Sequence, residues 1–360
     1  MPGRRDRATV RVRAFAKINL TLRVLGLRPD GFHDLRTTFQ SIALHDTLTC
    51  RARPGDFRIV CNDPACPSGE SNLVWQAAER VWAAGGRRGA PRDVEVRLVK
   101  RIPMEAGLAG GSSDAAAAVR AFAALWRVDL NGGRAHEIAS ALGADVPFFL
   151  EGGTALGVER GDVVYPLIDA PRMSVVVVVP SFGVSTREAF GWWDAAGAAQ
   201  RPRARGISER AEVRPRDQKA PAAMPAGASA QRDAHARHQR AAALSQERRG
   251  WAGAVREVGP REKARNDDRD VWIRLLLEGN DLEAPVAAHH PEIARLVTAL
   301  RRRGASYAAM SGSGSAVFGL FDRRAPASAA ATSLDRRGRR VLVTRTLDRA
   351  KYQRLARLAR

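Results

Sequence analysis

A glycine-rich stretch between a predicted strand and a predicted helix constrains the fold of this chain more than any other feature. It reads Pro103-Met-Glu-Ala-Gly-Leu-Ala-Gly-Gly-Ser-Ser-Asp-Ala-Ala-Ala117, with the strand-like residues 94–99 before it and an alanine-rich run to Trp126 behind it. Glycine lets the backbone approach a ligand closely, and the first turn of a helix offers unpaired N–H groups and a partial positive charge. The order of strand, loop and helix therefore predicts an anion-binding site.

Neither common phosphate motif matches this loop. It lacks the Gly-Lys-Ser/Thr ending of a Walker loop and one glycine spacing of the dinucleotide fingerprint. A purely structural interpretation is also open, in which Gly107, Gly110 and Gly111 shape a tight turn and Ser112 or Ser113 caps the helix.

The composition is that of a globular protein with a sizeable core. Hydrophobic residues make up 45% of the 360 residues and charged residues 27%, and a chain of this length is typical of two domains. No apolar run approaches the length of about 18 residues that a membrane-spanning helix needs. Met1 leads through charged residues into an alternating segment rather than an apolar signal core. We therefore expect a cytoplasmic protein without membrane attachment.

The net charge of +21 raises the question of a nucleic-acid partner, because clustered Arg and Lys neutralise phosphates. Only five of the 59 basic residues are lysines, which leaves 59 − 5 = 54 arginines spread over the whole chain. No recognition helix, zinc finger or aromatic RNA-binding motif focuses this charge. We interpret it as general basicity and do not expect nucleic acid as a partner.

Two polar residues lie on one face of the first predicted strand. Residues 8–25 alternate apolar and polar side chains, and Lys17 and Asn19 share one face of that pattern. If the other face is core, both point into whatever cleft the sheet borders, where a lysine could meet a phosphate or a substrate hydroxyl. A solvated strand face is the ordinary alternative.

Three further places carry chemistry. The turn Arg28-Pro-Asp-Gly-Phe-His33 ends in a ring for stacking and an imidazole that can donate and accept hydrogen bonds. Asp145 lies among apolar residues after a predicted helix at 134–142, where a carboxylate is paired, functional or a turn cap. Ser311-Gly-Ser-Gly314 is a second Gly/Ser loop that runs into a strand, and it strengthens the prediction of an anion site.

The ordered set of motifs resembles the GHMP kinase superfamily, which includes galactokinase and the homoserine, mevalonate and phosphomevalonate kinases. The matching segments are Ala16-Lys-Ile-Asn-Leu20, Asp30-Gly-Phe-His33, Pro103 to Ala117, Gly143-Ala-Asp-Val-Pro147 and Ser311-Gly-Ser-Gly314. The resemblance spans nearly the whole chain outside residues 195–270. Within the superfamily, the loop ending in Phe32 and His33 favours kinases that act on a cytidine diphosphate-linked methylerythritol, and a homoserine or mevalonate type is the alternative.

The resemblance implies an α/β (α+β) two-domain GHMP kinase fold. It implies an N-terminal ATP-binding domain at 1–170, similar to the second domain of ribosomal protein S5, and a C-terminal α+β domain at 171–194 and 271–350, with the ATP and substrate cleft between them. Residues 195–270 hold 17 Arg or Lys and 10 Asp or Glu with few large apolar residues. We expect a disordered or loosely helical insertion there, because so few apolar residues cannot offset the entropy of ordering.

The resemblance also implies the role of each motif residue. Lys17 and Asp145 would be catalytic, with Asp145 deprotonating the attacking hydroxyl. ATP, with Mg²⁺ bridging its phosphates, would be bound by Pro103, Gly107, Leu108, Ala109, Gly110, Gly111, Ser112, Ser113 and Asn72. The substrate would be bound by Asn19, Phe32, His33, Phe190, Ser311, Gly312 and Gly314, with cytosine stacked between Phe32 and Phe190. A monomer and a homodimer are both compatible with the motifs.

Two departures from the family pattern and two residue assignments leave questions open. Phe32 stands where many relatives have Tyr, so a hydroxyl is lost while the ring remains. Ala109 stands where a glycine is usual, and we expect it to need a negative φ. Phe182 and Trp192 are alternatives to Phe190 for the second stacking ring, and Ser112, Ser113 and Asp114 are alternatives for reaching the metal.

Overall fold

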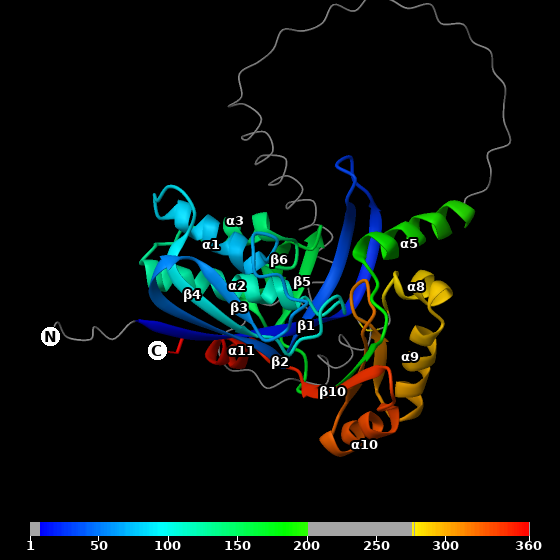
Figure 1. Ribbon diagram of the computed structural model, residues 1–360. Coiled ribbons are helices and arrows are strands. Elements are labelled where there is room, and N and C mark those ends of the chain that lie inside the picture. The colour runs from blue at the N-terminus through cyan, green and yellow to red at the C-terminus, as the bar shows by residue number, and fades with distance from the viewer. Residues whose placement is uncertain (1–7, 201–275, 277, 360) are drawn as a thin grey trace, which may run out of the picture. The chain divides into compact units, whose positions relative to one another are not determined.

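The computed structural model describes residues 8–200, 276 and 278–359 (Figure 1). The described residues 8–196, 276 and 278–359 belong to one compact unit. Most of the expected insertion at 195–270 lies outside the described residues, and its first residues belong to helix α5 (Thr186–Gln200). None of the described helices is long and apolar enough to cross a membrane.

The first sheet is built around one long strand. Its members are β1 (Thr9–Leu27), β2 (His33–Asp56), β3 (Arg58–Cys61), β4 (Arg92–Val99), β5 (Thr154–Glu159) and β6 (Val163–Pro166). β2 pairs antiparallel with β1 along one edge and with β4 and β5 along the other. The predicted turn between β1 and β2 is confirmed, with Gly31 at φ 82°. Bulges on both sides of the 17–19 segment shift the register, and bulges of this kind re-aim side chains beside active sites.

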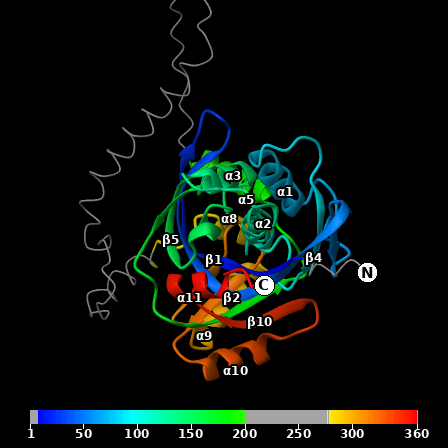
Figure 2. The same cartoon turned by 90° about the vertical axis from the view of Figure 1, so that its left-hand side faces the viewer.

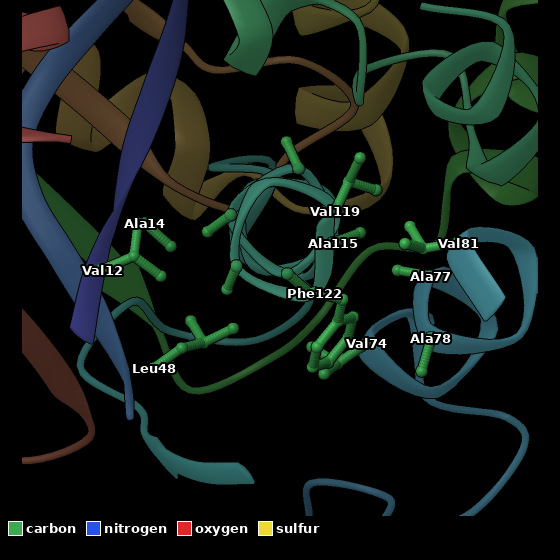
Figure 3. Packing of buried hydrophobic residues seen from close by; sticks show 14 of the residues in the cluster. Val12, Ala14, Leu48, Val74, Ala77, Ala78, Val81, Ala115, Val119 and Phe122 are labelled. Carbon is green, nitrogen blue, oxygen red and sulfur yellow. The ribbon is translucent and has the colours of Figure 1, made fainter. Parts of the chain in front are cut away.

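Helices cover one face of this sheet. They are α1 (Leu73–Ala84), α2 (Gly110–Trp126), α3 (Arg134–Leu142) and the short α4 (Phe148–Glu151). Figure 3 shows Ala115, Val119 and Phe122 of α2 packing between the sheet and α1, which contributes Val74 and Val81. The small alanine side chains let α2 approach the sheet closely. The apolar residues of α2 thus form part of the core that supports the glycine loop.

The second sheet has the order β10-β7-β9-β8 and is antiparallel throughout. Its strands are β7 (Ser174–Pro180), β8 (Tyr307–Met310), β9 (Val317–Phe321) and β10 (Arg339–Arg345). The helices that follow the undescribed segment are α8 (Glu283–His289), α9 (Glu292–Arg302), α10 (Arg324–Leu334) and α11 (Arg349–Leu355). The valine run of 174–180 is typical of a buried strand, and the apolar spacing of 291–303 is typical of a helix.

The valines of β7 pack against the first sheet on one face and against helices on the other. Val175 and Val177 pack in a cluster with Ile18 of β1, whereas Val176 and Val178 pack with α8, α9 and α10. Alternate side chains of a strand point to opposite faces, so β7 is buried on both. Helices, first sheet, second sheet and helices follow one another in Figure 2, where α2 lies above β1 and β2 and α10 lies below β10.

Candidate active site

The glycine loop joins β4 to α2 and leaves the start of α2 without a side-chain cap. Gly107 has φ 72° and Ala109, at the N-cap position, has φ 54°. The expectation of a negative φ at Ala109 was therefore wrong: the close packing of the loop imposes a left-handed conformation that usually requires glycine. The Ser113 hydroxyl donates to the Phe15 carbonyl at 2.7 Å instead of capping the helix. The first-turn N–H groups of α2 remain available to an anion.

The two Gly/Ser loops lie against each other. The Ser311 hydroxyl donates to the Gly107 carbonyl at 3.0 Å, and the Ala316 N–H donates to the Ala106 carbonyl at 3.2 Å. A Cβ on Gly107 would collide with the Ser311 carbonyl oxygen. Glycine is thus required at 107 by a close approach between two segments far apart in sequence.

Lys17, Asn19 and Asp145 come together beside these loops. The Lys17 Nζ lies 3.4 Å from Asp145 Oδ2 and donates to Asn19 Oδ1 at 2.6 Å. The backbone N–H of Lys17 donates to the Leu108 carbonyl at 3.2 Å, which ties β1 to the glycine loop. A Cβ on Gly312 would lie 3.4 Å from Lys17 Nζ, so the second loop also borders the ammonium group.

Lys17 and Asp145 differ in how far their side chains are exposed to solvent. The side chain of Lys17 is 4% exposed and that of Asp145 is 32% exposed. A ligand can therefore reach the carboxylate, while the ammonium forms part of the wall behind it. Such a pair can accept a proton from a hydroxyl and stabilise negative charge that develops nearby.

Sequence reasoning missed a buried charge cluster under the start of α2. Lys100 Nζ donates to Asp46 Oδ2 at 2.5 Å and to Asp114 Oδ2 at 2.7 Å, and all three side chains are 5% exposed or less. Asp46 Oδ1 also accepts from the N–H groups of Arg101 and Ile102, which lead into the glycine loop. The signal in the sequence was Asp114 directly before the alanine run of α2.

The cluster touches the loop itself. A Cβ on Gly110 would lie 3.2 Å from Lys100 Nζ and 3.0 Å from an Ile102 methyl group. One ammonium serves two buried carboxylates, and Asp114 Oδ1 has no hydrogen-bond partner among the described residues. Burial raises the pKa of Asp114 to about 7, against the attraction of Lys100 and with a further contribution from Asp46.

Asn72 caps α1 next to the loop. Its side-chain oxygen accepts from the Val74 N–H at 2.8 Å, and its amide donates to the Pro67 carbonyl at 2.6 Å. The next residue, Leu73, lies 3.8 Å from the position of a Cβ on Gly111. The predicted ATP residue is therefore close to the loop, with its side chain engaged by the protein.

The aromatic end of the site differs from the predicted sandwich. The rings of His33 and Phe190 are stacked, 4.7 Å apart at 16°, and Trp193 meets His33 edge-on. Phe32 is 55% exposed, with the Arg160 guanidinium 5.4 Å from its ring centroid. In this structure the ring that faces Phe190 belongs to His33 rather than to Phe32.

α5 supplies two residues that the sequence had not singled out. Asp194 Oδ1 lies 2.9 Å from His33 Nε2, and Trp193 borders the same imidazole. Their spacing of three and four residues from Phe190 puts all of them on one helix face. The two alternatives to Phe190 lie elsewhere, since Phe182 stacks on His290 and Trp192 on His289.

Comparisons with known proteins identify the family of the chain. The family "GHMP kinases N terminal domain" matches residues 72–153, and "GHMP kinases C terminal" matches residues 261–340. The 4-diphosphocytidyl-2-C-methyl-D-erythritol kinase of Moorella thermoacetica is 37% identical over 335 residues, covering 93% of this chain and 98% of the relative. That of Pelotomaculum thermopropionicum is 36% identical, with coverages of 93% and 97%.

Solved structures show the same fold. A crystal structure of 4-(cytidine 5'-diphospho)-2C-methyl-D-erythritol kinase matches with a TM-score of 0.62 and 28% identity, covering 93% of this chain and 98% of that one. The L. major mevalonate kinase matches in fold, with a TM-score of 0.59, 14% identity and coverages of 94% and 96%. With its paired glycine loops and its match to both family domains, the chain belongs to the GHMP kinases, in the group of the 4-diphosphocytidyl-2-C-methyl-D-erythritol kinases.

Proposed function

We propose that the protein transfers the γ-phosphoryl group of ATP to the 2-hydroxyl of 4-diphosphocytidyl-2-C-methyl-D-erythritol, a step of the non-mevalonate route to isoprenoid precursors. The observation that carries the proposal is the Lys17–Asp145 pair, 3.4 Å apart beside two glycine loops. The names of the relatives supply the substrate. Phosphoryl transfer depends mainly on positioning and charge stabilisation, which these elements can provide.

The glycine loop holds the ATP phosphates in this proposal. The N–H groups from Gly110 to Ser112 start α2 without a side-chain cap, so they can donate to phosphate oxygens. Leu108 is 1% exposed and contributes by anchoring the loop in the core. Pro103 begins the loop, and Asn72 supports it through the start of α1.

Asp145 accepts the proton of the attacking hydroxyl, and the oxygen then bonds to the γ-phosphorus as the bond to the β-phosphate oxygen breaks. Lys17 orients Asp145 and offsets the developing negative charge. Asn19 keeps one N–H and one lone pair free, because its other positions engage Lys17 and Thr37 at 2.6 and 2.7 Å. It can therefore bind a substrate hydroxyl.

The cytidine end binds at the aromatic cluster. Cytosine stacks between Phe32 and Phe190 after His33 swings away from Phe190, and His33 stays beside the base. Ser311, Gly312 and Gly314 border the other side of Lys17 and hold the phosphate-bearing part of the substrate. The glycines keep this loop close to the reacting groups.

Mg²⁺ fits the residues present. No group of three or more His, Cys, Asp or Glu side chains that could hold a metal occurs in the described ranges, and Mg²⁺ is commonly held by one or two protein ligands and the substrate phosphates. The Ser113 hydroxyl is engaged by the Phe15 carbonyl and Asp114 Oδ2 by Lys100, which leaves the Ser112 hydroxyl and the unpartnered Asp114 Oδ1 as the groups at the start of α2 that would hold the ion. When bound, the ion neutralises phosphate charge.

A coupled assay tests the proposal. Purified protein with ATP and Mg²⁺ should consume one ATP for each cytidyl substrate, and Asp145→Asn should lower kcat by roughly 10²- to 10⁴-fold with an unchanged circular dichroism spectrum. Turnover of homoserine or mevalonate with no turnover of the cytidyl substrate would reject this substrate. The alternative of another GHMP small-molecule kinase would then stand.

A further inference from the structure

A cavity outside the candidate active site has arginine at four of the eight positions that line it. It has a volume of about 420 Å³ and lies where α9 meets the end of α10 and the start of β10. Its charged lining consists of Arg295, Arg303, Arg336, Arg339 and a single acid, Glu292. None of these residues belongs to the motifs that form the kinase site, and the volume is in the range of small-ligand sites, about 300 to 1,000 Å³.

The charge of this cavity exceeds the general basicity of the chain. The lining has four arginines for one acid, whereas the whole chain has 59 basic residues for 38 acidic ones. Like charges that face one space repel each other, and a bound anion removes this cost. The composition of the chain alone therefore does not account for the cavity.

Two of the arginines are fixed in place by the protein. Arg339 Nε donates to Glu292 Oε1 at 2.6 Å, and Arg303 donates from Nε to Ser333 Oγ at 2.5 Å and from another nitrogen to the Ala299 carbonyl at 3.0 Å. Each guanidinium has five N–H donors, so most of those on Arg339 and some on Arg303 stay free. Donors oriented in this way lose little entropy on binding an oxyanion.

The other two arginines complete an open rim. Arg295 and Arg336 are exposed, and the described residues provide no hydrogen-bond or ion-pair partner for either side chain. Leu296 and Leu334, both buried, form an apolar floor between the helices. The site thus offers guanidinium forks above a small hydrophobic surface.

We propose that this cavity is an accessory binding site for a small phosphorylated or diphosphorylated metabolite, separate from the kinase site. Guanidinium forks match phosphate oxygens in bidentate geometry, and a concave site of this volume suits a small molecule better than a nucleic-acid backbone. The apolar floor accommodates a short hydrocarbon portion next to the phosphate. The inference does not depend on the proposed substrate of the kinase.

Calorimetric titration with inorganic pyrophosphate tests the site. The full chain is first saturated with Mg²⁺ and a non-hydrolysable ATP analogue, so that the glycine loop is occupied. Wild-type protein should then bind pyrophosphate at one saturable site. The double variant Arg295→Gln/Arg336→Gln should weaken binding at least about tenfold, because charge-assisted hydrogen bonds are lost.

A matched control separates this site from general charge. Arg323→Gln/Arg324→Gln removes the same charge at the opposite end of α10, and it should leave the dissociation constant within about twofold. Both double variants should keep wild-type kcat with ATP and substrate. The proposal is overturned by the absence of saturable binding, by equal weakening in the control, or by a short DNA duplex that displaces pyrophosphate and binds more tightly.

Discussion

At the scale of single residues, Lys17 and Asp145 act in our proposal as one unit. Lys17 is buried behind the more exposed Asp145 at 3.4 Å, so removal of either side chain disables the function of the other. Residues that act together lose activity non-additively. Two single variants and their combination can therefore test whether the pair is the catalytic unit.

We predict that Lys17→Ala and Asp145→Asn each lower kcat by roughly 10²- to 10⁴-fold, and that the double variant is little worse than the poorer single variant. Steady-state kinetics with saturating ATP measures this directly. If the two losses multiply in the double variant, the residues contribute independently and the coupled role assigned to Lys17 is wrong.

Asp114 should make stability fall as the pH rises. Burial raises its pKa from 3.8 to about 7 in the folded state. The folded state therefore holds the Asp114 proton more tightly than the unfolded chain does, and this contribution is complete below about pH 4 and is lost as the pH rises towards 7. A neutral side chain of the same shape avoids the loss.

We predict that wild type loses about 2 to 3 kcal/mol more of its free energy of unfolding than Asp114→Asn does when the pH rises from 5 to 8. Urea unfolding at the two pH values measures the difference. Asp335→Asn, at an exposed position after α10, should follow the wild type. Parallel pH profiles for Asp114→Asn and wild type would show that Asp114 does not titrate in this range.

At the scale of elements, two glycines of one loop have different physical reasons. Gly107 has φ 72° and abuts the Ser311 carbonyl, whereas a Cβ on Gly111 would meet only a Leu73 methyl group at 3.8 Å. The protein therefore requires glycine at 107. At 111, in our proposal, the requirement comes from the phosphates that approach the start of α2.

Substitution of each glycine by alanine should separate the two causes. Gly111→Ala should raise stability by up to about 1 kcal/mol, because alanine favours helix, while the KM for ATP rises about tenfold or more. Gly107→Ala should lower both stability and kcat, since the two loops are forced apart. Thermal unfolding and ATP titration of both variants provide the comparison, and an unchanged KM in Gly111→Ala would contradict phosphate binding at that position.

Ala109 is a strained position in the same loop. An alanine at φ 54° is strained by about 1 to 2 kcal/mol. Glycine would relieve this strain, but its greater conformational freedom in the unfolded chain offsets part of the stabilisation. We predict that Ala109→Gly stabilises the protein by about 0.5 to 1 kcal/mol in urea unfolding. Ala118→Gly, within α2, is the control and should destabilise. Destabilisation by Ala109→Gly as well would mean that the methyl group contributes more through packing than it costs in strain.

At the scale of the whole molecule, the two sheets contribute to one site. Gly107 follows β4 of the first sheet, and Ser311 follows β8 of the second. Asn280 connects the chain after the undescribed segment to this place, because its amide donates to the carbonyls of Met310 and Gly312 at 2.9 and 2.8 Å. The kinase site in our proposal thus needs the chain on both sides of residues 201–275.

We predict that residues 201–270 are dispensable for catalysis. Replacement by a Gly/Ser linker of equal length should keep kcat within about threefold, since every residue assigned to the kinase site lies elsewhere. The segment 195–270 carries a net charge of 17 − 10 = +7. A salt titration of duplex DNA binding for both proteins shows whether this charge recruits nucleic acid. Tight binding at physiological salt that disappears with the replacement would establish a nucleic-acid arm.

The sequence by itself determined the elements and the loop. Local sequence patterns predicted β1, β4, α2 and α3, because such patterns report which residues of an element are buried. Glycine spacing before an alanine-rich run predicted an anion site at 103–117, and the order of the motifs indicated the family.

Only the tertiary structure decided which side chains meet. The contact of Ser311 with Gly107 joins residues 204 positions apart, and the Lys100 cluster joins β2, the end of β4 and α2. The tertiary structure also determined the left-handed backbone conformation of Ala109 and the stacking of the His33 ring on Phe190. Local patterns record the preference of each residue for burial or turn, whereas these contacts depend on how the bulges of β1, the packing of α2 and the docking of the two sheets bring distant segments together.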